Sequence, residues 1–403
     1  MKKKTATVDN DDEAIHYGSS QFDSTVDAML WNLAIRTLLH DRGKLLAGLV
    51  GVVFSVVLVN IQGGLFSGLM GKASLLVDRS GADIWVGHRG MHNVDFPHGI
   101  PTRWINRVRS VPGVKNAEPM RIAFSEISLP GGEFESVAVV GVTEGSKLGK
   151  AFEIIEGPND AFDYADAVVV DQCDDSKLSH PEIGDVREIG GQRVRITGKC
   201  YGVLSFLVAP YVFTTHERSA ELTNTDPSMT SYFLVSLNSG ADRDQVAEEI
   251  RRRLKEVTVM TTEEYSSTSM NFWITRTGIG LSFGAATLMG LLVGLVMVGQ
   301  TLYAMVLDRI NEFATLKAIG ATEKDIVLLL GAQSSVVALL GIVVGTLLSM
   351  SIQSLLSTPR TEINISTQLY VISASLVFVI CLAASALPYL RVRRVDPHSV
   401  LQG

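Results

Sequence analysis

Charged side chains are absent from four long stretches of this chain. These stretches contain no Asp, Glu, Lys, Arg or His, and they lie between Lys44 and Lys72, Arg276 and Asp308, Asp325 and Arg360, and Glu362 and Arg391. Each is longer than the roughly 20 apolar residues that a helix needs to cross about 30 Å of hydrocarbon. Because lipid offers no partner to unpaired backbone groups, a helix is the open element expected there. The pattern predicts membrane-spanning helices over residues 44–70, 276–306, 326–354 and 368–390.

The connections between these spans differ greatly in length. Residues 71–275 separate the first two spans and have the composition of a soluble domain, whereas residues 307–325 and 355–367 are short loops. The first span is too long for the apolar region of a signal peptide, and no A-x-A site follows it, so we expect it to be retained. The expected fold is an α-helical membrane protein with four spans in a 1+3 arrangement and a large α+β domain between the first and second spans.

Basic residues flank the spans unevenly. They gather before the first span, between the second and third, and after the fourth: Arg36, Arg42, Lys44, Arg309, Lys317, Lys324, Arg391, Arg393 and Arg394. The loop 355–367 carries only Arg360. Because short basic loops stay in the cytoplasm, we predict that both termini are cytoplasmic and that residues 71–275 lie outside. The protein is then a multi-pass protein of the inner or plasma membrane.

The first 43 residues change in character at about residue 23. Residues 1–22 are polar and charged, which predicts a disordered cytoplasmic tail. In residues 23–43, Ser24 can cap a helix, and apolar residues then recur at the i, i+3, i+4 spacing of one helix face. A buried soluble helix has the same spacing. Because a span begins at once after it, an amphipathic helix lying at the cytoplasmic membrane surface is the favoured interpretation.

The domain at 71–275 mixes strand and helix patterns. Strands are predicted at 82–86, 121–129 and 134–142, with a helix at 101–109 and a turn at 130–132. A similar order returns later, with a strand at 232–237, a helix at 242–257 and a strand at 257–260. Between them, residues 145–225 are richer in glycine and short β runs, such as 167–170 and 193–197. We therefore expect a porter-like α/β lobe near the membrane with a β-rich insert at about 145–225.

Composition and motifs exclude several classes of function. The net charge is −7 and there is no basic stripe, which argues against nucleic-acid binding. G-x-x-x-x-G-K-[ST], G-x-S-x-G and H-E-x-x-H are all absent, so no catalytic residue and no cofactor is predicted. His88, His92 and His98, with Asp95, do not match a common zinc spacing, and a solvated loop is favoured over a metal site. The spans lack charged side chains, which argues against ion-driven transport.

Two cysteines lie in the predicted outside domain. Cys173 and Cys200 can form a disulfide if that compartment is oxidising, and two separate thiols are an equally good interpretation. Cys381 lies within the fourth span, where a small packing residue is expected. The segment 189–193 contains Gly190-Gly191 and predicts a β-turn.

The loop at 307–325 has the clearest pattern outside the spans. It predicts a short amphipathic helix that ends at Gly320, which suits the position after a helix C-terminus. Thr322 can then cap the third span, with Asp325 at the third position. A plain helical hairpin linking two spans is the alternative.

This loop also carries a family resemblance. The stretch Glu312-Phe313-Ala314-Thr315-Leu316-Lys317-Ala318-Ile319-Gly320-Ala321 resembles the coupling-helix motif of the FtsX-like and MacB-like ABC permeases. The C-terminal segment with Pro388, Arg391, Arg394, Asp396-Pro397 and Leu401 is similar too, as is the order of interfacial helix, span, outside domain and three spans. The DevC-type exporter permeases are similar in length and layout.

The resemblance implies a transport role without catalysis by this chain. A separate cytoplasmic ABC ATPase subunit would hydrolyse ATP, a second permease copy would complete a homodimer or heterodimer, and a periplasmic adaptor would receive the exported substrate. The implied ATPase contact comprises Arg309, Glu312, Phe313, Leu316, Lys317, Ile319 and Gly320. A mechanotransmitter that activates an extracytoplasmic hydrolase and a lipoprotein-releasing permease are alternatives within the family. A membrane sensor would need a cytoplasmic signalling module, for which the tail 391–403 is too short.

Overall fold

The computed structural model describes residues 40–150, 154–158, 161–162, 164–207 and 209–393. The predicted tail 1–22, most of the predicted interfacial helix 23–43 and residues 394–403 lie outside these ranges. The chain forms two compact units. The helical unit takes residues up to 64, 284–355 and those from 365 onward, and the α+β unit takes 65–283 and 356–364.

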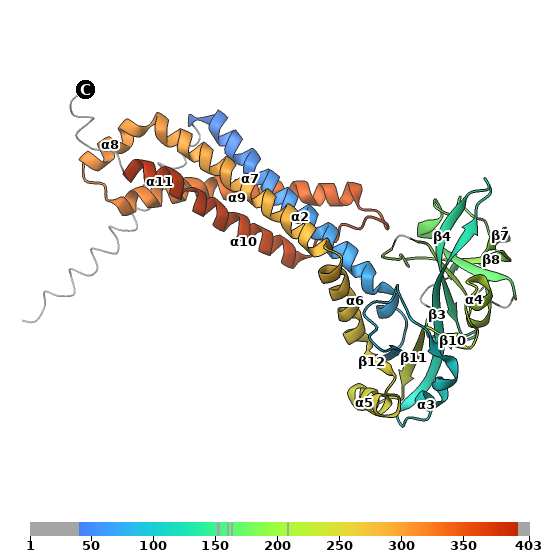
Figure 1. Ribbon diagram of the computed structural model, residues 1–403. Coiled ribbons are helices and arrows are strands. Elements are labelled where there is room, and N and C mark those ends of the chain that lie inside the picture. The colour runs from blue at the N-terminus through green and yellow to red at the C-terminus, as the bar shows by residue number, and fades with distance from the viewer. Residues whose placement is uncertain (1–39, 151–153, 159–160, 163, 208, 394–403) are drawn as a thin grey trace, which may run out of the picture. The chain divides into compact units, whose positions relative to one another are not determined.

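Four of the described helices are long and apolar enough to cross a membrane, with mean hydropathy between 2.2 and 2.4 (Figure 1). They are α2 (Arg42–Asp78), α7 (Ile279–Asp308), α9 (Glu323–Leu356) and the pair α10 (Thr367–Ala384) and α11 (Ala386–Arg393). The short α8 (Ile310–Ala318) lies between α7 and α9 in the chain. The prediction of four spans around a large α+β domain is thus confirmed.

Small residues let the helices of the helical unit approach closely. A Cβ added at Gly51 would lie 2.5 Å from the Cβ of Met297, and one at Gly341 would lie 2.5 Å from Val52. Buried hydroxyl and amide groups bridge the helices as well, since Ser373 donates to the Asn60 side chain at 2.6 Å. Such packing suits membrane helices, because lipid supplies no hydrophobic force that drives them together.

The α+β unit is built on one long sheet with strand order β12-β1-β11-β3-β4-β9-β6-β8-β5, and β7 pairs with both β3 and β8. Its strands are β1 (Ile84–His88), β3 (Val114–Ser128), β4 (Phe134–Val142), β5 (Ile154–Glu156), β6 (Ala167–Asp171), β7 (Val186–Ile189), β8 (Gln192–Cys200), β9 (Tyr211–Thr215), β11 (Tyr232–Leu237) and β12 (Val257–Thr261). A separate ribbon pairs β2 (Ile100–Pro101) with β10 (Met229–Thr230).

The helices of this unit are short except for α6. They are the 3₁₀ turns η1 (Thr102–Trp104) and η2 (Gln172–Asp174), and the α-helices α3 (Ile105–Arg109), α4 (His216–Leu222), α5 (Arg243–Arg253) and α6 (Thr262–Arg276). The helix predicted at 101–109 is therefore a 3₁₀ turn followed by α3. The helix predicted at 242–257 is capped by Asp242 and ends earlier, at Arg253.

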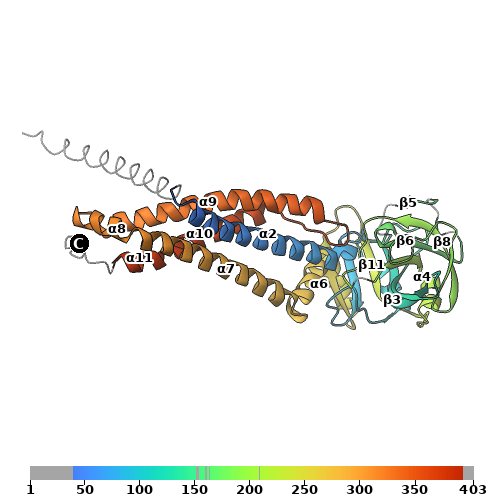
Figure 2. The ribbon, with the colours of Figure 1, turned by 90° about the horizontal axis from the view of Figure 1, so that it is seen from above.

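Each half of the sheet has a core of its own, and a third core that includes Trp85, Val140 and Phe213 spans both halves. Strands β1, β11 and β12 pack against α3 and α5 through Val86, Phe233 and Ile250, which are fully buried. In the other half, β6 is buried along its whole length, and Val168 and Val170 pack against Val212 of β9. Figure 2 shows β5, β6, β8 and α4 in this second half.

The strand β3 joins the two halves, which the sequence pattern did not predict. A strand was expected from residue 121, but β3 begins at Val114 because residues 114–120 pair with β11. The other part of β3 pairs with β4, and β4 pairs in parallel with β9. The β-rich half therefore includes β4 and is not confined to residues 145–225. Gly190 and Gly191, with φ of +58° and +78°, form the predicted turn between β7 and β8.

Candidate functional site

The helix α8 follows α7 with only Arg309 between them. Its apolar side is buried, because Phe313 is 5% exposed and packs with Val306 of α7, Leu329 and Leu330 of α9 and Val392 of α11. The side chain of Lys317 donates to the carbonyl oxygens of Val392 at 2.8 Å and Arg393 at 3.3 Å. A cation there satisfies carbonyl groups that the end of α11 leaves unpaired. The helix is thus attached to three others.

The turn after α8 is closed by backbone hydrogen bonds. Gly320 has φ of +104°, its N–H donates to Lys317, and the N–H of Ala321 donates to Leu316 at 2.9 Å. These two bonds form a Schellman motif, in which glycine is favoured because a Cβ is strained at positive φ. The next helix has the predicted cap: Thr322 N–H donates to the Asp325 carboxylate at 2.8 Å, and Asp325 N–H donates to Thr322 Oγ1 at 3.4 Å.

The predicted contact residues divide into two groups. Glu312 and Ile319 are exposed, with Ile319 at 76%, and Leu316 is half-buried beside them. Helical spacing places these three residues on one side of α8. Arg309 lies 3.5 Å from the carboxylate of Glu312. Phe313 and Lys317, by contrast, point toward the other helices of the unit. The short helix α8 therefore has an exposed face with Glu312 and Ile319, and an inward anchor formed by Phe313 and Lys317, which attach it to the other helices.

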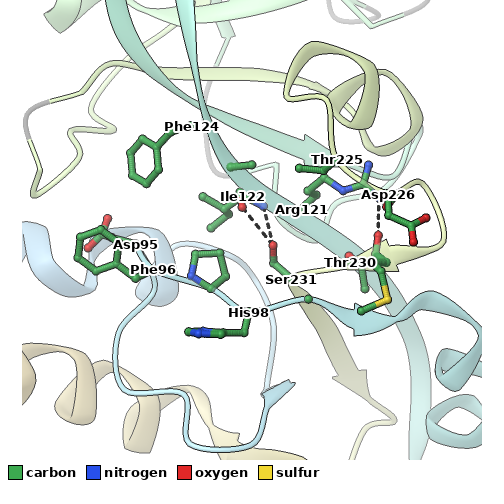
Figure 3. A pocket seen from close by; sticks show the side chains of 14 residues that line it. Asp95, Phe96, His98, Arg121, Ile122, Phe124, Thr225, Asp226, Thr230 and Ser231 are labelled. Atoms are coloured by element: carbon green, nitrogen blue, oxygen red, sulfur yellow. Dashed lines mark hydrogen bonds between the residues drawn. The ribbon is translucent and has the colours of Figure 1, made fainter. Parts of the chain in front are cut away.

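The α+β unit contains a cleft of about 350 Å³ beside β3 (Figure 3). Its aromatic sides are Phe96 and Phe124, which are 49% and 40% exposed and have ring centroids 6.3 Å apart. On this edge of β3, pairing with β11 stops at Met120 and pairing with β7 occurs only at Ile127. Sequence reasoning missed this cleft, because alternation along β3 gives no sign of where its neighbouring strand stops.

Asp95 lies at one end of the cleft and is buried. It is 3% exposed, and the Tyr211 hydroxyl donates to its Oδ1 at 3.2 Å. Its other oxygen, Oδ2, has no hydrogen-bond partner within the described part of the chain. Burial raises the pKa of Asp95 to about 6, and this rise is opposed by Tyr211 and by the nearby indole of Trp273. The Trp273 N–H is close enough to affect this pKa but is not placed to donate a hydrogen bond.

The three histidines near the cleft do not converge. His88 stacks on His98 with centroids 5.2 Å apart, and His92 stacks on Phe272 at 6.3 Å. Among the residues that the structure describes, no three His, Cys, Asp or Glu side chains gather where they could hold a metal ion.

Cys173 and Cys200 are free thiols in the structure, so the disulfide considered from the sequence is not formed there. Cys200 is buried and its sulfur lies 3.5 Å from the carbonyl oxygen of Val170. Cys173 lies two residues after Asp171, the residue that pairs with Cys200 across β6 and β8. Burial raises the pKa of Cys173 to about 11. A bridge between the two in the native compartment stays a prediction.

Two family models match the chain. A MacB-like periplasmic core domain matches residues 47–253, and an FtsX-like permease C-terminal region matches residues 284–397. An uncharacterized ABC transporter permease from Mycobacterium tuberculosis is 26% identical over 383 residues, covering 92% of this chain and 99% of the relative. An uncharacterized ABC transporter permease from Methanocaldococcus jannaschii is 30% identical over 128 residues, covering 30% of this chain and 31% of the relative.

Among solved structures, the periplasmic region of MacB from Actinobacillus actinomycetemcomitans is similar with a TM-score of 0.38 and 10% identity, covering 48% of this chain and 94% of that one. The extracellular domain of the ABC-type transporter YknZ from Gram-positive bacteria has a TM-score of 0.34 and 14% identity, covering 44% and 98%. The resemblance noted in the coupling motif is confirmed by the family models. The chain belongs to the ABC transporter permeases that join a MacB-like periplasmic core domain to an FtsX-like permease region.

Proposed function

We propose that this protein is the transmembrane subunit of an ABC complex, in which a separate cytoplasmic ATPase drives a change of shape in the α+β unit. The output is export of a substrate through a periplasmic adaptor. The observation that carries this proposal is the division of α8 into an exposed face and a buried anchor. A helix built to receive force needs a surface for the partner and a firm attachment behind it.

The attachment is firm because its contacts are close-packed. Phe313 lies among side chains of α7, α9 and α11, and Lys317 is held by the end of α11. Protein interiors have low compressibility, so a displacement of α8 is passed to these helices and not absorbed. In this proposal Phe313, Lys317 and Arg309 position the coupling helix, while Glu312, Leu316, Ile319 and Gly320 meet the ATPase.

The orientation follows the basic loops. Arg309 precedes α8, Lys317 lies in it and Lys324 follows it in the chain, which supports a cytoplasmic α8, cytoplasmic termini and an α+β unit on the outer side. A periplasmic core domain in the matching family model supports the same orientation. A second permease copy, as a homodimer or heterodimer, would pair two such coupling helices with two ATPase subunits.

Leu316→Asp tests the contact. The change puts a charge without a partner into the proposed interface, where leaving a charge unpaired is strongly unfavourable. We expect normal membrane insertion and a folded α+β unit, with loss of the co-purifying ATPase and of its activity. Asn311→Asp is the matched control, because it adds the same charge at an exposed position on another side of α8.

The proposal is wrong if the Leu316→Asp protein retains its ATPase at the wild-type ratio. The identity of the other co-purifying proteins separates the alternatives within the family. An adaptor beside the ATPase supports export, a cell-wall hydrolase supports mechanotransmission, and lipoprotein cargo supports lipoprotein release.

A further inference from the structure

The loop between α9 and α10 belongs to the α+β unit. Residues Leu356–Asn364 cluster with that unit, although the helices on both sides of them belong to the helical unit. The loop is ordered by its own hydrogen bonds, since Thr361 N–H donates to Thr358 Oγ1 at 3.0 Å and Ile363 N–H donates to Ser357 Oγ at 3.1 Å. It is therefore a short, folded connection and a direct covalent link from two spans to the α+β unit.

Three contacts hold this loop to the unit. The Arg360 guanidinium lies 2.7 Å from the carboxylate of Asp174 in η2. The ammonium group of Lys72, near the end of α2, donates to the carbonyl oxygen of Arg360. Gly68 of α2 approaches the carbonyl of Glu362 so closely that a Cβ there would collide with it. The loop thus meets both the end of α2 and the turn that follows β6.

The ion pair is not an ordinary surface pair. The Asp174 side chain is only 4% exposed and that of Arg360 is 32% exposed. Burial raises the pKa of Asp174, and the hydrogen bond and charge of Arg360 lower it, with a smaller lowering by Lys177. Removing the guanidinium would leave a buried carboxylate poorly compensated, which is far less favourable than breaking an exposed pair.

We propose that Arg360 and Asp174 form a clip that transmits movement of α9 and α10 to the β-rich half of the α+β unit. Arg360 lies four residues after the end of α9, so a shift of that helix reaches the clip through a short connection. Asp174 lies in η2, which follows β6 directly, and β6 pairs with both β8 and β9. A shift of Arg360 would therefore move β6 and the strands beside it. The two residues are positioning residues, and their role rests on the proposed ATP-driven function.

The test measures whether ATP changes the α+β unit through this clip. The full-length protein, purified with its ATPase, is compared with and without ATP plus vanadate by hydrogen–deuterium exchange of peptides covering residues 167–178. The wild type should show a nucleotide-dependent change in exchange there. Arg360→Gln should lose that change while ATP hydrolysis continues.

Two further variants guard against simple misfolding. The double variant Arg360→Gln/Asp174→Asn leaves no buried charge without a partner, so it should fold as the wild type does and still lose the nucleotide response. The exchanged pair Arg360→Asp/Asp174→Arg should regain part of it. Lys199→Gln is the matched control, because it breaks the neighbouring Lys199–Asp175 pair at 2.7 Å without touching the loop, and it should keep the response.

Each result bears on the proposal. An unchanged nucleotide response in both the Arg360→Gln and the double variant would overturn the clip. Equal loss in the Lys199→Gln control would overturn it too, because the effect would then reflect general loosening around η2. Absence of any ATPase in the wild-type preparation would refute the proposed function itself, and the clip with it.

Discussion

Asp95→Asn is expected to change how the stability of the α+β unit depends on pH. The substitution keeps the size of the side chain and an oxygen that accepts the hydrogen bond of Tyr211, which lies 3.2 Å away. It removes the ionisable group at a site that is 3% exposed and has an oxygen without a hydrogen-bond partner among the described residues. The variant therefore isolates the free energy of placing a charge at that site.

The magnitude follows from the pKa of Asp95, which rises from 3.8 to about 6 on folding. Between these two values the folded protein binds the proton more tightly than the unfolded chain does. The stability that this group contributes is therefore complete below pH 3.8 and is lost as the pH rises through 6. At 1.36 kcal/mol per pKa unit, the loss is about 3 kcal/mol. The amide that replaces the carboxyl group does not titrate. Because about 0.5 kcal/mol of the loss occurs below pH 4, the variant should gain about 2.5 kcal/mol relative to the wild type between pH 4 and 7.

The stability of the variant must be compared with that of the wild type at each pH, because other groups titrate in the same pH range. Burial and the nearby Arg121 charge lower the pKa of His216 from 6.5 to about 4. Its folded form stays neutral while the unfolded form takes up a proton, so its contribution falls as the pH drops from 6.5 to 4. This trend opposes that of Asp95 and cancels when the variant is compared with the wild type.

The assay is urea unfolding of the full-length protein in detergent, followed by tryptophan fluorescence at several pH values. Trp85, Trp104 and Trp273, of the four tryptophans, lie in the α+β unit and report on its transition. A constant difference between the two proteins from pH 4 to 7 would refute the reasoning, because it would mean that Asp95 is equally easy to ionise in the folded and unfolded chains.

Three other predictions follow from the fold. A reporter fused at Gly145 should read outside the cell membrane and one at Gly403 inside, and a cytoplasmic reading at Gly145 would contradict the orientation. In intact cells, a thiol reagent should label Cys173 slowly without a reductant, because its raised pKa leaves little thiolate; labelling of Cys173 and Cys200 only after reduction would instead reveal a disulfide. Gly320→Val should loosen the turn after α8 by roughly 1–2 kcal/mol, because a β-branched residue is strained at φ of +104°; unchanged amide exchange over residues 310–322 would contradict this.

Local features could be predicted from the sequence, because each depends on residues that are neighbours in the chain. The runs without charge around α2, α7, α9 and α10 indicate spans, since transfer into lipid is a property of the segment itself. The end of α8 at Gly320, the cap at Thr322 and the turn at Gly190-Gly191 follow from backbone preferences and short-range hydrogen bonds. The helix α8 could therefore be found without knowing what it packs against.

Pairing and burial could be learned only from the tertiary structure. Nothing near Val114 shows that β3 begins there, because its partner β11 lies more than 100 residues away along the chain. The sequence places Phe313 and Ile319 in one amphipathic helix, but the positions of α7, α9 and α11 decide which of them is buried. Asp95 and Asp174 look like ordinary loop carboxylates until distant segments cover them. Desolvation and ion pairing depend on atoms brought together across the fold, whereas helix spans and caps depend on atoms that the chain already holds close.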